Sequence, residues 1–395
     1  MLKVAVLGYG VVGSGVCEVI RTNAKSLEEK LGDSVEVKYV LDIKEVNPND
    51  PEAAKITKDF SAILNDPEIS VVAEVMGGAT FAYDYTKQLL MAGKHVVTSN
   101  KELVATKGTE LLSIAKEKNV NYLFEASVGG GIPIIRPLYS CLAANEINRI
   151  TGILNGTTNY ILTKMFREGS DFATALSEAQ EKGYAERNPS ADVDGIDACR
   201  KIAILASLVF GKEVECDKVK TVGITGITAT DVSYADKMGS VIKLIGQAEL
   251  KDQKVYVSVE PRIIKKGTPL ASIDDVFNGI MVNGNAIGEV VFYGPGAGKL
   301  PTASAVVADI IDCLRNDRNR EYFWTKAESD FVAESTENFG CYLIRTKHSE
   351  EISKKLPIAE KVSVVDGEIG LVTEQIREEE LNEVLPYAVS YMKLA

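Results

Sequence analysis

Histidine is scarce in this chain, which has only two among its 395 residues, His95 and His348. Imidazole is the commonest metal ligand of proteins and the side chain most often used as a general acid or base near neutral pH. A metal cluster built on histidines is therefore nearly excluded. Only His95, inside the strand-like segment "KHVVTS", is a candidate acid–base group, and a strand residue with a local hydrogen bond is the simpler interpretation.

Cysteine pairs and long apolar runs are missing as well. The six cysteines include no C-x-x-C pair, so the sequence suggests neither a zinc site nor a disulfide framework. Several lie in apolar or helical surroundings, where cysteine acts as a small buried hydrophobe, and this fits a reducing cytoplasm. No apolar run approaches the roughly 18 residues of a membrane span, and the N-terminal "MLKVAVLGYG" is predicted to be a strand rather than a signal peptide.

Basic patches are also missing. The formal net charge is −12, and no basic run is longer than two residues. Such a charge disfavours nucleic acids and anionic membranes as partners. What remains is an ordinary globular composition, 45% hydrophobic and 25% charged, and enough chain for two or three domains.

Apolar strands alternate with helical segments in the first third of the chain. The expected strands are residues 2–7, 35–42, 70–78, 94–100 and 120–128. This alternation is typical of βαβ units in a parallel, doubly wound sheet. We predict an α/β Rossmann-type domain over residues 1–130, completed by the amphipathic helix 302–316.

The pattern changes after "GGGIPII". Longer helices and later β-like segments predict a second, α+β domain over residues 131–301, with a mixed sheet and helices on one face. Residues 329–395 are expected to form a small third module, in which short strands surround a helix. These strands are 341–346, 361–367 and 369–374, with "VDGEIG" as a hairpin turn.

A G-x-G-x-x-G pattern at Gly8, Gly10 and Gly13 follows the first strand and opens a helix. Glycines there let the backbone approach a pyrophosphate, which then faces the N–H groups of the helix. This predicts dinucleotide binding, although an ordinary glycine-rich turn has the same pattern.

Asp42 ends the second strand, where an acid binds the ribose of NAD and repels a 2′-phosphate. Lys44 could offset that repulsion, and a solvated strand-end aspartate is the alternative.

Two further segments leave strands at their carboxyl ends, where ligands bind in open α/β sheets. "TSNKELVATKG" places Ser99, Asn100 and Lys101 beside the expected nicotinamide, although Lys101 also fits an ordinary surface charge at a helix start. "EASVGGGIP" joins the first two domains, and its three glycines let the backbone approach a ligand or act as a hinge.

Charges crowd into the segment "NPSADVDGIDACRK" in front of an apolar helix. Asp192 and Asp194 precede the helix, where carboxylates suit its positive end. Asp197 and Lys201 are four residues apart and therefore face the same way. Caps and one helical ion pair explain the aspartates, but they leave unexplained a lysine on a helix otherwise made of apolar residues.

Lys201 is the natural acid–base group of a chain with so little histidine. Partial burial favours the neutral amine, while the neighbouring aspartate favours the ammonium, so the lysine is expected to stay a proton donor. Glu186, in "KGYAERNP", adds a carboxylate to the same region. Clustered carboxylates favour a substrate with a cationic group such as an amine.

Taken together, these residues resemble homoserine dehydrogenases. The resemblance covers roughly residues 2–316, and its most specific parts are "SNKELVA", "EASVGGGIPII", "GILNGTTNYIL", "EAQEKGYAERNPSADVDGIDACRKIAILA" and "GPGAGKLPTASAVVADI". That family reduces L-aspartate 4-semialdehyde to L-homoserine with NADPH or NADH, on the path to threonine, methionine and often isoleucine. The resemblance implies the same activity here, in a homodimer or tetramer assembled through the second domain.

The resemblance also implies a role for each matching residue. Lys201 corresponds to the proton donor, with Lys101 on the nicotinamide side. The implied substrate-binding residues are Glu186, Asp192 and Asp197. The implied cofactor cradle is Gly10, Val11, Val12, Gly13, Ser99 and Gly298. A monovalent cation, Na⁺ or K⁺, held mostly by backbone carbonyls, is implied at Glu125, Val128, Gly130 and Ile132.

The chain departs from the family pattern in two places. Members that prefer NADP have "VRD" at the end of the second strand, whereas this chain has "VLD", so the choice between NAD and NADP stays open at Leu41 and Asp42. Many members carry a regulatory ACT domain where residues 329–395 lie, but "TKHSEEISKK" replaces its usual "D-x-P-G-V-L" start. An ACT-like module with an amino-acid effector is therefore expected without a commitment to threonine.

The predicted reaction transfers a hydride to the aldehyde carbon in a cleft between the domains, while Lys201 protonates the alkoxide. One rival, a phosphorylating semialdehyde dehydrogenase, needs a cysteine nucleophile beside a histidine. Cys141 and Cys199 have apolar helical surroundings, and His95 is their only realistic partner, so this rival is disfavoured. The other rival is a catalytically silent, nucleotide-sensing regulatory protein, which would bind the cofactor without turnover.

Overall fold

The chain folds into two compact units, each built from three separate stretches. The structure, a computed structural model, describes residues 1–315, 322–328, 330–334 and 337–395. Residue 316, at the end of one expected helix, and residue 329, at the start of the expected third module, lie outside these described residues. The first unit comprises Met1–Ala144, Ile204–Glu215 and Gly294–Lys326, and the second comprises Asn145–Ala203, Cys216–Tyr293 and Ala327–Ala395.

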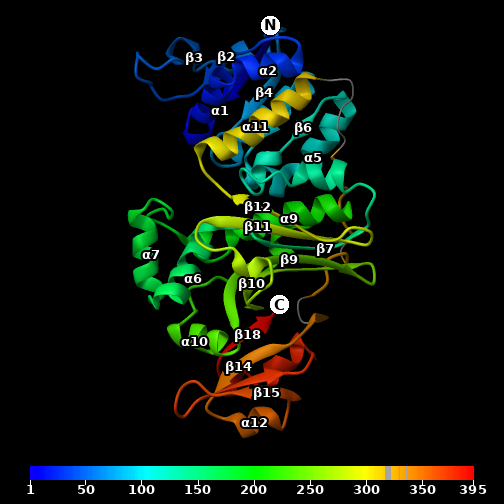
Figure 1. The fold of residues 1–395 in the computed structure, drawn as a ribbon. Helices are drawn as coiled ribbons and strands as arrows, with labels where there is room; N and C mark the ends of the chain where they lie inside the picture. Colours follow the sequence, from blue (N-terminus) through cyan, green and yellow to red (C-terminus); the bar gives the residue numbers. More distant parts are fainter. Residues whose placement is uncertain (316–321, 329, 335–336) are drawn as a thin grey trace. The chain divides into compact units, whose positions relative to one another are not determined.

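The first unit is built on a six-stranded sheet in the order β3-β2-β1-β4-β5-β6, and all its strand pairs are parallel (Figure 1). The strands are β1 (Leu2–Leu7), β2 (Val35–Leu41), β3 (Ile56–Thr57), β4 (Ile69–Glu74), β5 (His95–Thr98) and β6 (Tyr122–Leu123). The helices are α1 (Val11–Thr22), α2 (Ala24–Leu31), α3 (Phe60–Leu64), α4 (Thr80–Met91), α5 (Lys101–Lys118) and α11 (Lys299–Leu314). This strand order is that of the Rossmann fold, so the predicted doubly wound sheet is confirmed.

Two details of this unit differ from the sequence-based expectation. The short β3 and α3 were not expected, because two strand residues and five helical ones give too little periodicity to recognise. The expected strand 120–128 is shorter, since only Tyr122–Leu123 pair with β5 and Glu125–Ser127 form a 3-10 turn.

Helix α11 reaches the first unit from far along the chain and lies alongside α1 (Figure 1). The two helices approach closely at Gly15, where a Cβ atom would lie 2.9 Å from the carbonyl oxygen of Lys299 and 3.0 Å from the Cβ of Ala303. A side chain at Gly15 would therefore separate the helices, which explains a glycine inside α1 despite its cost to helix stability.

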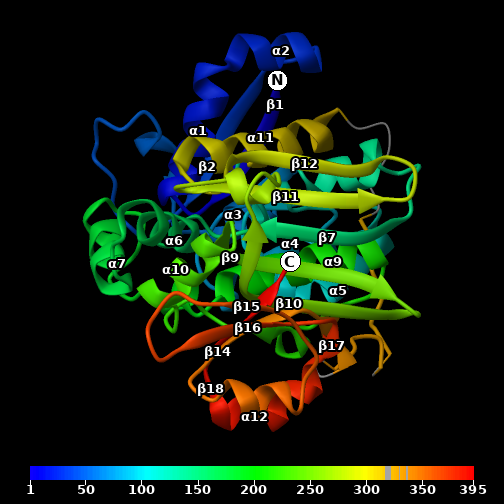
Figure 2. The same ribbon diagram turned by 60° about the horizontal axis from the view of Figure 1, so that its bottom comes forward.

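The second unit is built on a mixed sheet in the order β12-β11-β7-β9-β10-β18-β14-β16-β15, with β8 also paired to β10 (Figure 2). The strands are β7 (Ile147–Ile153), β8 (Lys220–Thr221), β9 (Ser240–Lys251), β10 (Lys254–Lys265), β11 (Phe277–Gly284), β12 (Gly288–Pro295), β14 (Tyr342–Thr346), β15 (Ile358–Val362), β16 (Ile369–Thr373) and β18 (Ala388–Leu394). A separate pair joins β13 (Phe339–Gly340) and β17 (Ile376–Arg377). The helices are α6 (Gly156–Glu168), α7 (Phe172–Glu181), α8 (Ser190–Val193), α10 (Ala229–Lys237) and α12 (Ser349–Ser353). Helix α9 (Ile196–Phe210) begins in this unit, and its residues from Ile204 on belong to the first unit. The pairs of β10 with β8 and β18 are parallel and its pair with β9 is antiparallel, as expected for a mixed sheet.

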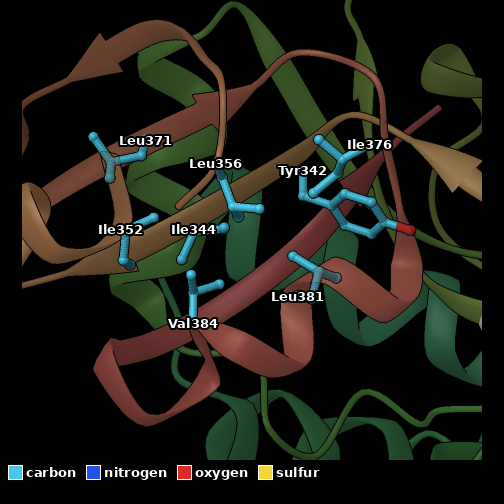
Figure 3. Packing of buried hydrophobic residues seen from close by; sticks show 8 residues of the cluster. All are labelled: Tyr342, Ile344, Ile352, Leu356, Leu371, Ile376, Leu381 and Val384. Atoms are coloured by element: carbon cyan, nitrogen blue, oxygen red, sulfur yellow. The ribbon is translucent and has the colours of Figure 1, made fainter. Parts of the chain in front are cut away.

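The C-terminal strands form one end of this sheet. They bury an apolar core whose members are Tyr342, Ile344, Ile352, Leu356, Leu371, Ile376, Leu381 and Val384 (Figure 3). The hairpin between β15 and β16 is confirmed, although the first strand ends at Val362, so the expected strand 361–367 lies mostly in the turn. Because β18 also pairs with β10, this segment continues the main sheet. Its likeness to an ACT domain stays a prediction.

In the described part of the chain, no helix combines the length and the apolar character that a bilayer crossing requires.

Candidate cofactor and substrate sites

The glycine-rich turn between β1 and α1 has the geometry of a phosphate cradle. Gly8 adopts a φ of +96°, and a Cβ on Gly13 would lie 1.9 Å from the carbonyl oxygen of Gly8. Gly10 is the N-cap of α1, and no described atom lies within 4 Å of the position where its Cβ would be. Gly8 and Gly13 are thus required by the turn itself, whereas Gly10 leaves open space at the helix N-terminus. Val11 and Val12 follow as the first helical residues.

Asp42 follows β2 and contacts the same turn. Its carboxylate accepts hydrogen bonds from the backbone N–H of Tyr9 at 2.6 Å and of Lys44 at 2.8 Å. The Tyr9 hydroxyl in turn donates to Asp50 at 2.7 Å. The sequence-predicted acid is therefore beside the glycine-rich turn, where a ribose would lie in a Rossmann fold.

A buried network that the sequence analysis missed connects the strand ends of the first unit. Glu74, at the end of β4, is fully buried and accepts hydrogen bonds from the Thr98 hydroxyl and the Met76 N–H. The Thr98 oxygen accepts from the N–H of Asn100, whose side chain donates to the Gly78 carbonyl oxygen at 2.7 Å. The network joins the two loops that follow β4 and β5. No sequence signal distinguished Glu74 from an ordinary strand-end acid.

Ser99 and Lys101 are positioned through Asn100. The Asn100 side chain accepts a hydrogen bond from the N–H of Leu103 and thereby caps α5, of which Lys101 is the first residue. Ser99 and Lys101 are half-buried at this carboxyl edge of the sheet. The sequence-predicted nicotinamide segment therefore begins a helix at the expected edge.

Glu74→Gln is expected to flatten the pH dependence of stability. Burial raises the pKa of Glu74 from its usual 4.5 to about 7. The folded state therefore binds this proton more tightly than the unfolded state, and the free energy of unfolding falls as pH rises from about 4.5 to about 7, by on the order of 3 kcal/mol. Glutamine carries no titrating proton. The free energy of unfolding of this variant, measured by urea denaturation between pH 4 and 8, should therefore fall less as the pH rises. The exposed Glu360→Gln is the control, and parallel curves for Glu74→Gln and wild type would contradict the assignment.

The segment expected to bind a cation is organised around Glu125. Its carboxylate is buried and accepts hydrogen bonds from the backbone N–H groups of Ile134, Ile135 and Arg136, at 2.6, 2.9 and 2.7 Å. Its own N–H donates to Asp309, whose pKa burial raises to about 8. The Glu125 side chain thus already has three donors, and the remaining oxygens for a cation in this segment are backbone carbonyls.

The triple glycine adjoins Glu125 and lies against the loop before α11. Gly129 and Gly130 have φ values of +74° and +55°, and a Cβ on Gly130 would lie 2.5 Å from the Gly296 carbonyl oxygen. Gly298, the N-cap of α11, has a φ of +120°. Val128 and Ile132, which flank the glycines, are buried. Backbone carbonyls are hard oxygen ligands of the kind that such cations take, so the segment fits the predicted ion. The described residues contain no group of three His, Cys, Asp or Glu side chains arranged for a metal.

Lys201 and Asp197 form a buried ion pair at the start of α9 in the second unit. The ammonium of Lys201 lies 2.7 Å from the carboxylate of Asp197 and donates a second hydrogen bond, also 2.7 Å long, to the carbonyl oxygen of Leu154. The two side chains are only 9% and 7% exposed. The predicted pair is therefore present. Its lysine also binds the backbone at Leu154, which is remote in sequence.

Asn155 is a second residue that the sequence analysis missed. Its amide donates to Asp192 at 2.7 Å and to Asp197 at 2.9 Å, while its oxygen accepts from the N–H of Thr158 and caps α6. Asn155 thus draws two of the predicted carboxylates together. An Asn before "GTT" was a recognisable cap signal, but its contact with α9 was not.

Glu186 and Asp194 lie outside the hydrogen-bonded group that Asn155 forms with Asp192, Asp197 and Lys201. Both are exposed, Glu186 in the loop after α7 and Asp194 as the C-cap of α8. The backbone carbonyl of Glu186 accepts a hydrogen bond from Gln180. The structure therefore brings Asp192, Asp197 and Lys201 together around Asn155, while Glu186 belongs to a nearby exposed segment of the chain.

His95 has a structural role. Its Nδ1 accepts a hydrogen bond from the N–H of Asn121 at 2.8 Å, and burial lowers its pKa. A neutral imidazole that links β5 to the segment before β6 agrees with the simpler interpretation of this residue.

The fold and these sites define a nicotinamide-nucleotide-dependent oxidoreductase. A Rossmann sheet with a glycine-rich turn forms the NAD-binding domain of such enzymes, and a lysine–carboxylate pair is buried on α9. Family models agree: "Homoserine dehydrogenase, NAD binding domain" matches residues 8–125 and "Homoserine dehydrogenase" matches residues 133–311. The chain belongs to the homoserine dehydrogenase family.

Individual relatives support this assignment. The homoserine dehydrogenase of Bacillus subtilis is 43% identical over 80% of this chain and 74% of its own length. A crystal structure of a homoserine dehydrogenase from Thiobacillus denitrificans matches with a TM-score of 0.90 and 33% identity, covering 100% of this chain and 98% of that one. A hyperthermophilic archaeal homoserine dehydrogenase in complex with NADPH matches with a TM-score of 0.68 and 29% identity, over 81% of this chain and 99% of that one. The regulatory alternative finds no support among these matches.

Proposed function

We propose that this chain catalyses the reversible reduction of L-aspartate 4-semialdehyde to L-homoserine, with Lys201 as the proton donor. The observation that carries this proposal is the buried Lys201–Asp197 pair, held by the Leu154 carbonyl oxygen within 2.7 Å. Through its family, the proposal also places the enzyme in threonine, methionine and isoleucine biosynthesis.

Lys201 would protonate the carbonyl oxygen of the aldehyde as it becomes an alkoxide. When bound, the nicotinamide supplies the hydride for the carbonyl carbon. Asp197 lies close enough to favour the ammonium form of Lys201. In the reverse direction the same amine accepts the proton of the homoserine hydroxyl. Lys101, at the start of α5, is proposed to assist from the nicotinamide side.

The carboxylates are proposed to bind the amino group of the substrate. Asp192 and Asp197 are both oriented by the Asn155 amide, so they present a fixed pair of acceptors. Glu186, which is exposed, would complete this set by moving with its loop. Holding the substrate in one orientation supplies a large part of the acceleration in such reactions.

The nucleotide is proposed to lie on the glycine-rich turn, with its phosphates at Gly10, Val11, Val12 and Gly13. Asp42 would accept hydrogen bonds from the ribose. Because its carboxylate already accepts from two backbone N–H groups, it stays in place beside the turn. Ser99 and Gly298 complete the proposed cradle.

Initial rates of L-homoserine oxidation with NAD⁺ and NADP⁺ test the activity and the role of Asp42 together. Turnover with either nucleotide is expected, and absence of turnover with both would refute the proposed function.

Asp42→Ala removes the charge that would repel a 2′-phosphate, so the ratio of kcat/KM for NADP⁺ to that for NAD⁺ should rise at least tenfold. An unchanged ratio would show that Asp42 does not face the ribose. Adding L-threonine to the same assays tests the proposed effector of the C-terminal module.

The cation and the oligomer are further parts of the proposal. Na⁺ or K⁺ is proposed to bind the backbone carbonyls of Glu125, Val128, Gly130 and Ile132, and the second unit is proposed to form a homodimer or tetramer. Thermal unfolding in NaCl or KCl against choline chloride tests the cation, since a bound ion raises the melting temperature. Light scattering tests the oligomer.

A further inference from the structure

Two cysteines that are far apart in the sequence meet beside the proposed catalytic helix. Cys199 lies in the first turns of α9, between Asp197 and Lys201, and its sulfur lies 3.5 Å from the carbonyl oxygen of Cys216. The two side chains are also close enough for each to shift the pKa of the other. Both are reduced, with Cys199 buried and Cys216 half-buried. Cys216 is therefore the partly exposed member of the pair.

The surroundings favour a reactive thiolate on Cys199. Interaction with the Cys216 side chain lowers the pKa of Cys199 to about 7 against the opposing effect of burial, and the pKa of Cys216 is raised. Arg200 adds a favourable positive charge for the thiolate. Cys17 is the contrast within the chain, because burial raises its pKa to about 12 and keeps it a protonated, unreactive thiol.

The segment that follows Cys216 packs against the start of α9. The N–H of Ile224 donates to the Val193 carbonyl oxygen at 2.8 Å, and a Cβ on Gly223 would lie 2.2 Å from that same oxygen. A Cβ on Gly195 would lie 3.1 Å from the Thr221 side chain. A change in the position of this segment must therefore move the residues that lead into Asp197 and Lys201.

We propose that Cys199 and Cys216 form an oxidisable dithiol whose disulfide inactivates the site on α9. The Cys199 thiolate attacks hydrogen peroxide and, with uptake of one proton, releases water, which leaves a sulfenic acid. The Cys216 sulfur then displaces the sulfenic oxygen as a second water, so that two thiols and one peroxide give one disulfide and two waters. An external dithiol reverses the reaction by exchange.

The disulfide is expected to move the catalytic lysine. Its two sulfurs must approach to about 2.04 Å, well inside any hydrogen-bonding distance, so α9 and the turn at Cys216 are drawn together. Displacements of about 1 Å in an active site cost on the order of 100-fold in rate. The inference that oxidation lowers turnover rests on the proposed function, whereas formation of the disulfide does not.

Peptide mapping and activity measurements on the protein test both parts. The protein with Cys141→Ser, which removes the exposed thiol, is treated with hydrogen peroxide and then analysed by mass spectrometry and by homoserine oxidation. A peptide linking Cys199 to Cys216, a fall in kcat of at least tenfold and recovery with dithiothreitol are expected, with Cys17 still reduced. Adding Cys216→Ser should abolish the linked peptide and leave a smaller recoverable loss, because only the sulfenic acid of Cys199 can then form.

Three outcomes would overturn the proposal. These are no linked peptide, a linked peptide with full activity, or an equal recoverable loss in the Cys216→Ser protein. If the reduced protein does not oxidise homoserine at all, the proposed function fails, but the peptide map still decides whether the dithiol forms a disulfide.

Discussion

Replacing Lys201 by methionine is expected to lower kcat for homoserine oxidation by roughly 10²- to 10⁴-fold, the usual contribution of a positioned general acid or base. Methionine keeps the length of the side chain but has no proton to give. The dissociation constant for NADH or NADPH should stay within about twofold of wild type, because the cradle residues belong to the other unit. Stopped-flow turnover and nucleotide fluorescence titration measure the two quantities separately.

A loss of protein stability would confound the effect of Lys201→Met on turnover. Asp197 would remain buried with its charge unpaired, which typically costs about 3–5 kcal/mol, although the Asn155 amide still donates to it. The double variant Lys201→Met with Asp197→Asn removes the stranded charge. It should recover most of the lost stability, seen in urea unfolding, and recover none of the turnover.

Lys201→Arg separates charge from proton transfer. Arginine keeps a permanent positive charge beside Asp197 but does not deprotonate in proteins. We expect it to preserve more stability than methionine does and still to lose turnover. Turnover close to wild type in either single variant would show that another group supplies the proton, and Lys101 would be the first to examine.

Gly13→Ala is expected to abolish nucleotide binding and to destabilise the first unit. The added Cβ would lie 1.9 Å from the backbone oxygen of Gly8, and no side-chain rotation relieves this clash because the backbone fixes the position of a Cβ. The turn or the start of α1 must move, at a cost of about 1–3 kcal/mol. The N–H groups that face the phosphates move with it. Unfolding curves and fluorescence titration with NADH measure the two effects.

Gly10→Ala is the matched control for Gly13→Ala, because it adds the same methyl group to the same turn. Its φ of −78° suits alanine, and no described atom lies within 4 Å of the new Cβ, so stability should change by less than about 0.5 kcal/mol. The methyl group would occupy the space through which a pyrophosphate approaches the backbone. The dissociation constant should therefore rise at least tenfold, which is about 1.4 kcal/mol. Normal binding by Gly10→Ala would mean that the phosphates lie elsewhere.

Some of the site could be predicted because it depends on neighbours in the sequence. The contact between Asp197 and Lys201 follows from the four-residue spacing of a helix. The turn at Gly8, Gly10 and Gly13 follows from steric limits on a strand-to-helix connection. The Rossmann sheet follows from the alternation of apolar strands with helices, since parallel strands require crossover connections.

Other parts of the site needed the tertiary structure. The Leu154 carbonyl oxygen that holds Lys201 is 47 residues away in the chain, and the Asn155 amide lies 42 residues from Asp197. Glu74 meets Thr98 only because β4 and β5 are neighbours in the sheet. No local periodicity encodes such pairs, because their geometry depends on how whole strands and helices pack.

The sequence by itself determined the family of this protein, its nucleotide cradle and the lysine–aspartate pair, since each depends on residue type and short spacing. Only the tertiary structure decided which groups hold that pair, and that Cys199 meets Cys216 across a 17-residue separation. The physical reason is that burial and hydrogen bonding between remote segments are set by the packing of the complete core.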